Sequence, residues 1–198
     1  VAPHFPNLEF LNFGGGIGIP YKPDDTAIDV EEFGEKANEL FSNFCKSYGR
    51  NLTLMMEPGR YVCGEAGILV AEVNTLKKTP QGRVFAGLNT GYHHLVRPLT
   101  YGSYHPIINV SNSSGEQKKY DIAGNICESG DLFARDRMIN EIREGDLLAI
   151  THAGASGFCM ANHYHLRPLP PEIVIDGDKK IVSREREKFE DIIAPYNL

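Results

Sequence analysis

The chain has 198 residues, of which 41% are hydrophobic, and it carries a formal net charge of -6 with a sequence pI near 5.6. This length allows a buried core in one domain or two small ones, and the acidic balance argues against nucleic acid or anionic lipid as a partner. The sequence has no apolar run of the roughly 20 residues that span a bilayer and no signal peptide at its start, so it predicts a cytoplasmic enzyme or binding protein.

The first predicted elements are a strand, a helix and a second strand. Residues 8–13, LEFLNF, form a short apolar run that ends in a glycine cluster: Gly14, Gly15, Gly16 and Gly18. From Asp29 apolar residues recur three and four apart, Glu32 stands where a capping box needs it, and Gly49 predicts the helix end. Residues 52–56 form the second apolar run. Such units build parallel sheets with right-handed crossovers.

These first elements, which we call the opening unit, would not make a domain by themselves. Two parallel strands with one crossover helix leave both sheet edges and one sheet face open. The sequence therefore predicts that the chain begins partway through an α/β domain.

Beyond Gly67 the pattern changes to short β-type runs separated by turns. The runs are ILVAEVNTLKKT, RVFAGLN, IINVSN, KKYDIAG, DLLAITHAG and EIVIDGDKKIV. Such spacing is typical of an all-β sandwich or barrel. Residues 183–193 then predict a charged helix with Phe189, Ile192 and Ile193 on its apolar side.

Two motifs of the opening unit carry groups that can hold an anion or a cofactor. The triple glycine follows a strand, where backbone N–H groups can approach an anion closely, although the same glycines could simply make a tight turn. Glu57 and Arg60, in EPGR, follow the second strand, at the edge where parallel α/β folds place ligands. The carboxylate could accept the N–H of a heterocycle and the guanidinium could bind a carboxylate or phosphate, with a structural ion pair as the alternative.

The cysteines and histidines give little support for a metal site. The cysteines lie far apart with no CxxC pair, which predicts reduced thiols: Cys45, Cys63, Cys127 and Cys159. His163 and His165 flank Tyr164, but residues two apart point the same way only on a strand, and no third ligand is evident. No metal is therefore predicted.

Motifs from Gly14 to Glu172 resemble those of diaminopimelate decarboxylases, within the fold-type III family of pyridoxal-phosphate-dependent amino-acid decarboxylases. They occur in the family's order: the triple glycine, EPGR followed by AG, RP with a nearby tyrosine and YHPI, CESGD, and a methionine followed by a tyrosine and RPxPxE. The resemblance implies that residues 1–66 are the last strands and helix of a TIM-type β/α barrel. Residues 67–198 would form a β-sandwich-like or barrel-like domain with a terminal helix, and the protein would be a homodimer with shared active sites.

The resemblance also implies the cofactor, pyridoxal 5'-phosphate, and the residues around it. The triple glycine would hold its phosphate, and Glu57 would pair with the protonated pyridine nitrogen, which strengthens the ring as an electron sink. Gly59 and Arg60 would lie beside them, with Arg60 reaching phosphate or substrate carboxylate. Tyr164 would pack against the cofactor phosphate.

Four further residues would serve the substrate. Arg97 and Tyr101, in RPLTY, would grip the distal carboxylate of a diamino diacid. Cys127 and Glu128, in CESGD, would enter the partner subunit's site, where the thiol donates a proton and the carboxylate attracts the distal ammonium. As an alternative, Cys127 could be an inert core thiol. The implied reaction is decarboxylation of meso-2,6-diaminopimelate to L-lysine.

The chain departs from the family pattern at several positions. Ser156 stands where the family has an aromatic residue, His165 where it has an asparagine, and Thr100 where an apolar residue is usual. The family's Schiff-base lysine and ring-stacking histidine precede its triple glycine, and neither segment is among these 198 residues. We therefore expect that this chain alone does not hold the cofactor covalently.

Two other functions remain open from the sequence. One is a decarboxylase for ornithine, arginine or another basic amino acid, against which Arg97 argues, because such a substrate has no second carboxylate. The other is a non-catalytic dimerisation or regulatory module derived from the family.

Overall fold

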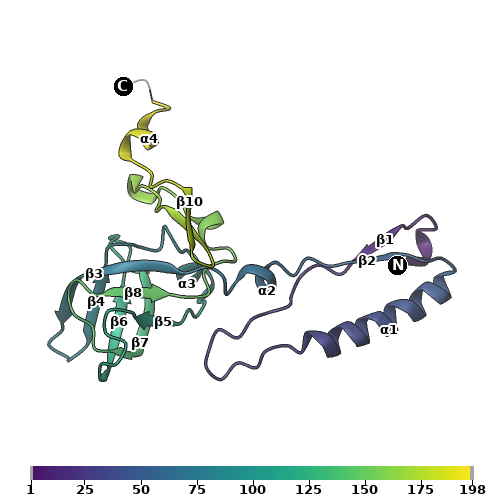
Figure 1. Cartoon of the computed structure of the whole chain (residues 1–198), viewed down its shortest axis with the longest axis horizontal. Helices are drawn as coiled ribbons and strands as arrows, with labels where there is room; N and C mark the ends of the chain where they lie inside the picture. The colour runs from purple at the N-terminus through teal and green to yellow at the C-terminus, as the bar shows by residue number, and fades with distance from the viewer. Residues whose placement is uncertain (1, 197–198) are drawn as a thin grey trace.

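The structure is a computed structural model that describes residues 2–196 (Figure 1). These residues form a parallel strand pair, a six-stranded sheet and an antiparallel hairpin. The strand pair and its helix lie at one end of the molecule and the six-stranded sheet at the other, with α2 (Gly59–Cys63) between them (Figure 1). No helix within residues 2–196 is both long and apolar enough to cross a membrane.

The opening unit folds as the predicted strand, helix and strand. After the short turn η1 (Ala2–His4), β1 (Phe10–Asn12) pairs in parallel with β2 (Thr53–Met55). The helix α1 (Val30–Tyr48) connects the two strands. The period-based prediction of these three elements is thus confirmed.

The ends of α1 follow the predicted signals with one difference. The Asp29 side chain accepts hydrogen bonds from the backbone N–H groups of Glu31 and Glu32, both at 3.0 Å. Gly49 closes the helix with φ of 81°, a conformation that glycine adopts without strain. The expected capping box is only half made, because the Glu32 carboxylate accepts from the ammonium of Lys36 at 2.5 Å instead.

The six-stranded sheet dominates the rest of the chain, and we call residues 69–166 the sheet region. Its strands are β3 (Leu69–Lys78), β4 (Val84–Leu88), β5 (Ile107–Asn109), β6 (Gln117–Ala123), β7 (Leu132–Asn140) and β8 (Leu147–Ile150). Their order is β5-β8-β3-β4-β6-β7, and only the β4 and β6 pair is parallel. A side-chain nitrogen of Arg137 on β7 donates to the His105 carbonyl just before β5 at 2.8 Å. The two edges of the sheet therefore come together, as in the barrel-like rather than the sandwich-like expectation.

The main hydrophobic core lies within this sheet. Its buried members are Ala71, Val73, Ala86, Leu88, Leu95, Ile107, Tyr120, Ile122, Phe133, Ala134, Ile139, Ile142, Leu148 and Ile150. Every one belongs to the sheet region. That region therefore folds around a core of its own.

Strand β7 was missed by the sequence analysis. The charged run Arg135, Asp136 and Arg137 interrupts the apolar alternation that identified its neighbours. Asp136 has φ of 48°, and its N–H donates to the carboxylate of Asp121 on β6 at 2.7 Å. The strand is irregular here, so a strict period of two does not describe it.

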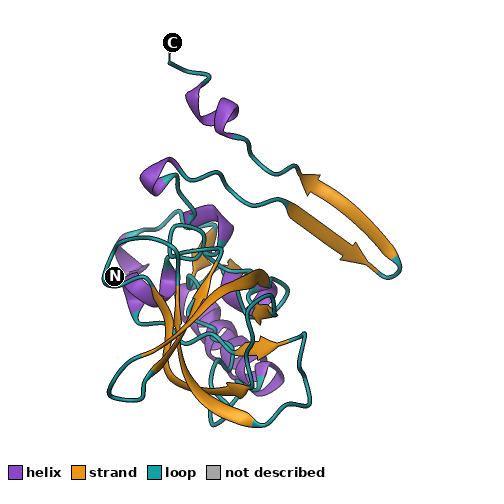
Figure 2. Cartoon of the chain, turned by 90° about the vertical axis from the view of Figure 1, so that its left-hand side faces the viewer, coloured by secondary structure: helices purple, strands orange, loops and turns teal. Residues whose placement is uncertain are grey.

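The C-terminal segment differs from its prediction in length. A hairpin of β9 (Glu172–Asp176) and β10 (Lys179–Arg184) stands apart from the six-stranded sheet (Figure 2). The terminal helix α4 spans only Phe189–Ile193, not 183–193. Arg184 instead pairs with Glu172 across the hairpin, which extends the strand into the predicted helix.

Candidate functional site

The triple glycine forms an open loop after β1. Gly14 and Gly16 have φ of 70° and 93°, and no atom lies within 4 Å of where their Cβ atoms would stand. A Cβ on Gly15 would lie 2.6 Å from the carbonyl oxygen of Glu57. Within residues 2–196 the N–H groups of Gly15 and Gly16 have no hydrogen-bond acceptor. The loop therefore presents free backbone donors to space that an anion can enter.

The carboxylate of Glu57 is held by a residue that the sequence analysis did not single out, Asn12. The Asn12 amide donates to Glu57 Oε1 at 2.6 Å, and its oxygen accepts from the Gly14 N–H at 2.7 Å. The backbone N–H of Glu57 also donates to the Gly14 carbonyl at 2.8 Å. Strand end, glycine loop and carboxylate are thus one hydrogen-bonded unit, with Glu57 Oε2 left unbonded within the described residues.

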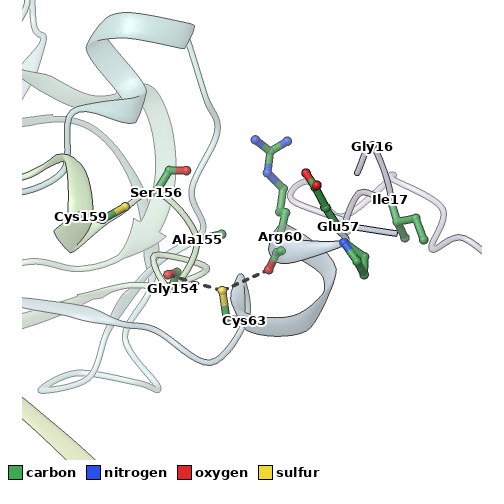
Figure 3. Close-up of a pocket in the computed structure, with 11 residues that line it drawn as sticks. Gly16, Ile17, Glu57, Arg60, Cys63, Gly154, Ala155, Ser156 and Cys159 are labelled. Atoms are coloured by element: carbon green, nitrogen blue, oxygen red, sulfur yellow. Dashed lines mark hydrogen bonds between the residues drawn. The ribbon is translucent and has the colours of Figure 1, made fainter. Parts of the chain in front are cut away.

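A cavity of about 520 Å³ lies beside this unit. Gly16, Glu57, Gly59 and Arg60 line one side of it, and the loop at 154–156 lines the other. Figure 3 shows the Glu57 carboxylate and the Arg60 guanidinium pointing to the same side of the backbone. Binding pockets for small ligands commonly measure roughly 300–1,000 Å³, so this cavity can hold one. The structure brings these predicted residues together, while their roles stay predictions.

The far wall of the cavity comes from the segment after β8. A Cβ on Gly154 would lie 1.8 Å from the Cys63 carbonyl oxygen, and its N–H donates to the Gly64 carbonyl at 3.0 Å. Glycine is therefore required where α2 packs against this loop. Ser156, with φ of 55°, faces Arg60 across the cavity (Figure 3). In the sequence, Ser156 stood out only as a departure from the family pattern, and no motif indicated this wall.

A second group of residues surrounds Arg97, the first residue of α3 (Arg97–Tyr101). The Arg97 side chain is buried, with 4% of the residue exposed, and its Nη2 donates to the hydroxyls of Tyr21 at 3.3 Å and Ser103 at 3.2 Å. Its Nε is buried without a partner in the described residues. The Tyr101 ring lies 5.8 Å from the guanidinium and is largely exposed. Arg97 and Tyr101 are therefore neighbours as expected, while Tyr21 and Ser103 were not foreseen.

A third group forms around Cys127, which is exposed. Its sulfur lies 3.6 Å from Nε2 of His165 in the turn η3 (Tyr164–Leu166). The Tyr164 ring packs 4.3 Å from the His165 ring, centroid to centroid. Glu128 accepts from the Gly130 N–H at 3.2 Å. None of these residues lines the cavity, so within this chain the structure separates Cys127, Glu128 and Tyr164 from the glycine loop.

The aspartate of CESGD holds the turn that carries Cys127. The buried Asp131 carboxylate accepts from the N–H groups of Tyr92 at 2.6 Å and Ile126 at 2.9 Å. Burial raises the pKa of Asp131, and these two N–H donors oppose that rise. A Cβ on Gly124 would stand 2.1 Å from the same carboxylate, which explains the glycine there. Asp131 is therefore a structural anchor of the motif.

One buried and one partly buried histidine lie beside this turn. His93 is 1% exposed, and burial, followed by the nearby His94, Arg167 and His165, lowers its pKa to about 4. Burial likewise lowers the pKa of His94, against a hydrogen bond with the Pro168 carbonyl at 3.0 Å. His93 is thus neutral at pH 7.

Comparisons with known proteins converge on one family. Residues 5–64 match the model of the pyridoxal-dependent decarboxylase pyridoxal binding domain, and residues 60–154 match the pyridoxal-dependent decarboxylase C-terminal sheet domain. The chain is 47% identical to a diaminopimelate decarboxylase of Methanothermobacter thermautotrophicus over 96% of the chain and 45% of that protein. It is 35% identical to one of Aquifex aeolicus, over 96% of the chain and 43% of that protein. The chain thus spans less than half the length of these relatives.

The fold has matching solved structures. The structure of diaminopimelate decarboxylase from M. jannaschii in co-complex with L-lysine aligns with a TM-score of 0.89 and 34% identity. The alignment covers 96% of this chain and 43% of that one.

Proposed function

Because the chain belongs to the pyridoxal-dependent decarboxylase family, we propose that the protein containing it decarboxylates meso-2,6-diaminopimelate to L-lysine. The cavity that is lined by Gly16 of the glycine loop, Glu57 and Arg60 is the observation that carries this proposal. When bound, pyridoxal phosphate supplies an electron-accepting ring that stabilises negative charge at the substrate α carbon. The chain would contribute barrel elements up to about residue 66 and the sheet domain from about residue 67.

The residues at the cavity fit this cofactor. The free N–H groups of Gly15 and Gly16 suit a phosphate, since backbone donors without side chains can approach its oxygens. The unbonded oxygen of Glu57 suits a protonated ring nitrogen, and the Asn12 hydrogen bond fixes that carboxylate in place. Arg60 would bind the cofactor phosphate or the carboxylate nearest the reacting carbon.

The second carboxylate of the substrate would bind at Arg97. This guanidinium has a buried Nε without a partner in the described residues and only long hydrogen bonds, of 3.2 and 3.3 Å, on Nη2. A carboxylate could take both nitrogens at once, which is the geometry that arginine offers best. Tyr101 would close over it and exclude water. A monocarboxylic amino acid has no second carboxylate that could bind this buried guanidinium, so we favour the diacid as substrate.

The remaining residues would act across a homodimer. Cys127 would deliver a proton from Sγ to the substrate α carbon, and Glu128 would orient the distal ammonium. The separation of Cys127 from the cavity within one chain supports a site that combines two subunits. Tyr164, which lies with Cys127, would contact the phosphate in that assembled site.

The substrate assignment is tested by Arg97→Ala in the natural full-length protein. We expect kcat/KM for meso-diaminopimelate to fall, because one carboxylate loses its buried partner. The fall should correspond to about 2–5 kcal/mol of lost transition-state binding. Any slow turnover of L-lysine or L-ornithine should change little. Arg135→Ala, on an exposed position of β7, is the matched control. Equal losses for diacid and monoacid would reject Arg97 as the carboxylate site.

A further inference from the structure

The contact between Cys127 and His165 is a feature that the proposed function leaves unused. The two residues are 38 positions apart, yet Sγ and Nε2 lie 3.6 Å from each other. This distance is within hydrogen-bond range for sulfur, and both residues are exposed. A thiol and an imidazole in contact can pass a proton between them, because either atom can hold it.

The structure holds both partners in place from the same segment. On one side, Asp131 ties the Cys127 turn to the Tyr92 N–H at 2.6 Å. On the other side, the N–H of Asn162 donates to the carbonyl of His93 at 2.9 Å. Tyr92 and His93 are adjacent, so the two turns share one anchor. The pair is therefore built into the fold.

The backbone at His165 points to the same conclusion. His165 and Leu166 have φ of 56° and 53°, in a region that residues other than glycine rarely occupy. Such conformations persist only where surrounding contacts impose them. The Tyr164 N–H donates to the Asn162 side chain at 3.0 Å, and the Leu166 N–H donates to the His163 carbonyl at 2.7 Å. These contacts turn the His165 ring toward Cys127.

Several titratable groups surround the pair. Glu128 follows Cys127 in the same turn, while Tyr164 packs on the His165 ring. Arg167 and His93 are also near, because both Arg167 and His165 contribute to the lowered pKa of His93. Buried His93 stays neutral at pH 7, so it adds no charge beside the pair.

We propose that His165 is the positioning residue of Cys127 that returns a proton to its sulfur. This inference rests on the proposed function of Cys127 as proton donor. In each turnover the Sγ–H bond breaks and the proton goes to the substrate α carbon, which leaves a thiolate. The thiolate electron pair then takes the proton from Nε2 of protonated His165, and the exposed imidazole takes a proton from solvent. The thiol and the imidazolium are both restored, and the proton balance closes.

The pair can be tested in the full chain without cofactor or substrate. Alkylation by iodoacetamide is followed at each cysteine peptide by mass spectrometry between about pH 5 and 9, since only the thiolate reacts. Cys159, also exposed, is the internal reference. We expect Cys127 to react about tenfold faster than Cys159 near pH 6.5, and His165→Asn to remove this difference. His163→Asn, two positions away, is the matched control and should leave it intact.

Two outcomes would overturn the proposal. One is an unchanged rate at Cys127 in His165→Asn while Cys159 also keeps its rate. The other is full reactivity in His165→Gln, because its amide can donate a hydrogen bond to sulfur but cannot exchange a proton at these pH values. If His165→Asn fails to fold, the His165 ring titration followed by NMR serves instead. Its midpoint should shift in Cys127→Ala, and an unchanged midpoint contradicts the pair.

Activity measurements test the proton return by His165 separately from the decarboxylase function on which it rests. In the natural full-length protein, His165→Asn should lower kcat for meso-diaminopimelate most at high pH, where a proton from solvent is scarce, and leave KM nearly unchanged. An unchanged kcat–pH profile would refute the proton return while the decarboxylase function stands. If the wild-type protein does not decarboxylate the diacid at all, the function fails, whatever alkylation reports about the pair.

Discussion

The opening unit and the sheet region differ in how far their apolar side chains are buried. In the sheet region Leu88, Ile122 and Leu148 are fully buried in a shared core. In the opening unit Leu40 is 71% exposed and Phe13 is 53% exposed. A two-stranded parallel pair with one helix is marginal by itself. The sheet region is therefore stable through its own packing, whereas the opening unit needs an apolar partner surface that residues 2–196 do not provide.

The largest effect that tests this contrast is a core deletion in the sheet region. Leu148→Ala should lower the free energy of unfolding by about 2–5 kcal/mol, because it removes buried methyl groups and leaves a cavity. The measurement is urea unfolding of the chain followed by circular dichroism.

The matched control in the opening unit is Leu40→Ala. Since this side chain is mostly exposed, we expect a change within about 0.5 kcal/mol. Comparable losses for the two variants would mean that the opening unit is packed as tightly as the sheet region, which would contradict the inferred difference in packing between the two regions.

A smaller effect concerns the pH dependence of the free energy of unfolding of the sheet region, in which His93 is buried. Because the pKa of His93 is lowered to about 4 in the folded state, the unfolded chain binds an additional proton between about pH 6.5 and pH 4. His93 alone should therefore reduce the free energy of unfolding by up to about 3 kcal/mol as the pH falls through this window, with no effect above it.

The test compares unfolding at pH 7 and pH 4.5 in His93→Gln and in the wild-type chain. The variant should lose less stability between the two pH values, and exposed His4→Gln should behave as wild type. An equal pH dependence in His93→Gln and wild type would show that His93 titrates normally in the folded protein.

The sequence predicted those elements whose side chains follow a simple period. The parallel unit around α1 came directly from apolar spacing and turn residues, whereas residues 172–182 were predicted only as one β-type run, which the structure folds into the hairpin of β9 and β10. Strand β7 was not predicted, because its charged run at Arg135 and Asp136 interrupts the apolar alternation. The Asp136 N–H instead donates to the Asp121 carboxylate on β6, a contact that no local sequence pattern indicates. The terminal helix was drawn too long because Arg184 pairs across the hairpin instead of continuing the helix.

The candidate site likewise contains residues that could be predicted from the sequence and contacts that could not. Motif positions such as Glu57 and Arg60 could be predicted to share one edge, because both follow a parallel strand. The support of Glu57 by Asn12 could not, since the two are 45 positions apart and meet only when β1 and β2 pair. The contact of Cys127 with His165 is equally long in range and depends on two separate turns. Sequence patterns report local chemistry, and these contacts arise from tertiary packing.

The central claim is that the opening unit of one subunit and the Cys127 turn of another complete one active site. Its most direct test mixes two inactive dimers of the natural full-length protein, Glu57→Ala and Cys127→Ala, under conditions of subunit exchange. A heterodimer then has one site with both residues intact, so meso-diaminopimelate decarboxylation should return to about half the wild-type rate per heterodimer. If mass spectrometry shows exchange and activity stays at the parental level, Glu57 and Cys127 do not meet across the interface and the account is wrong.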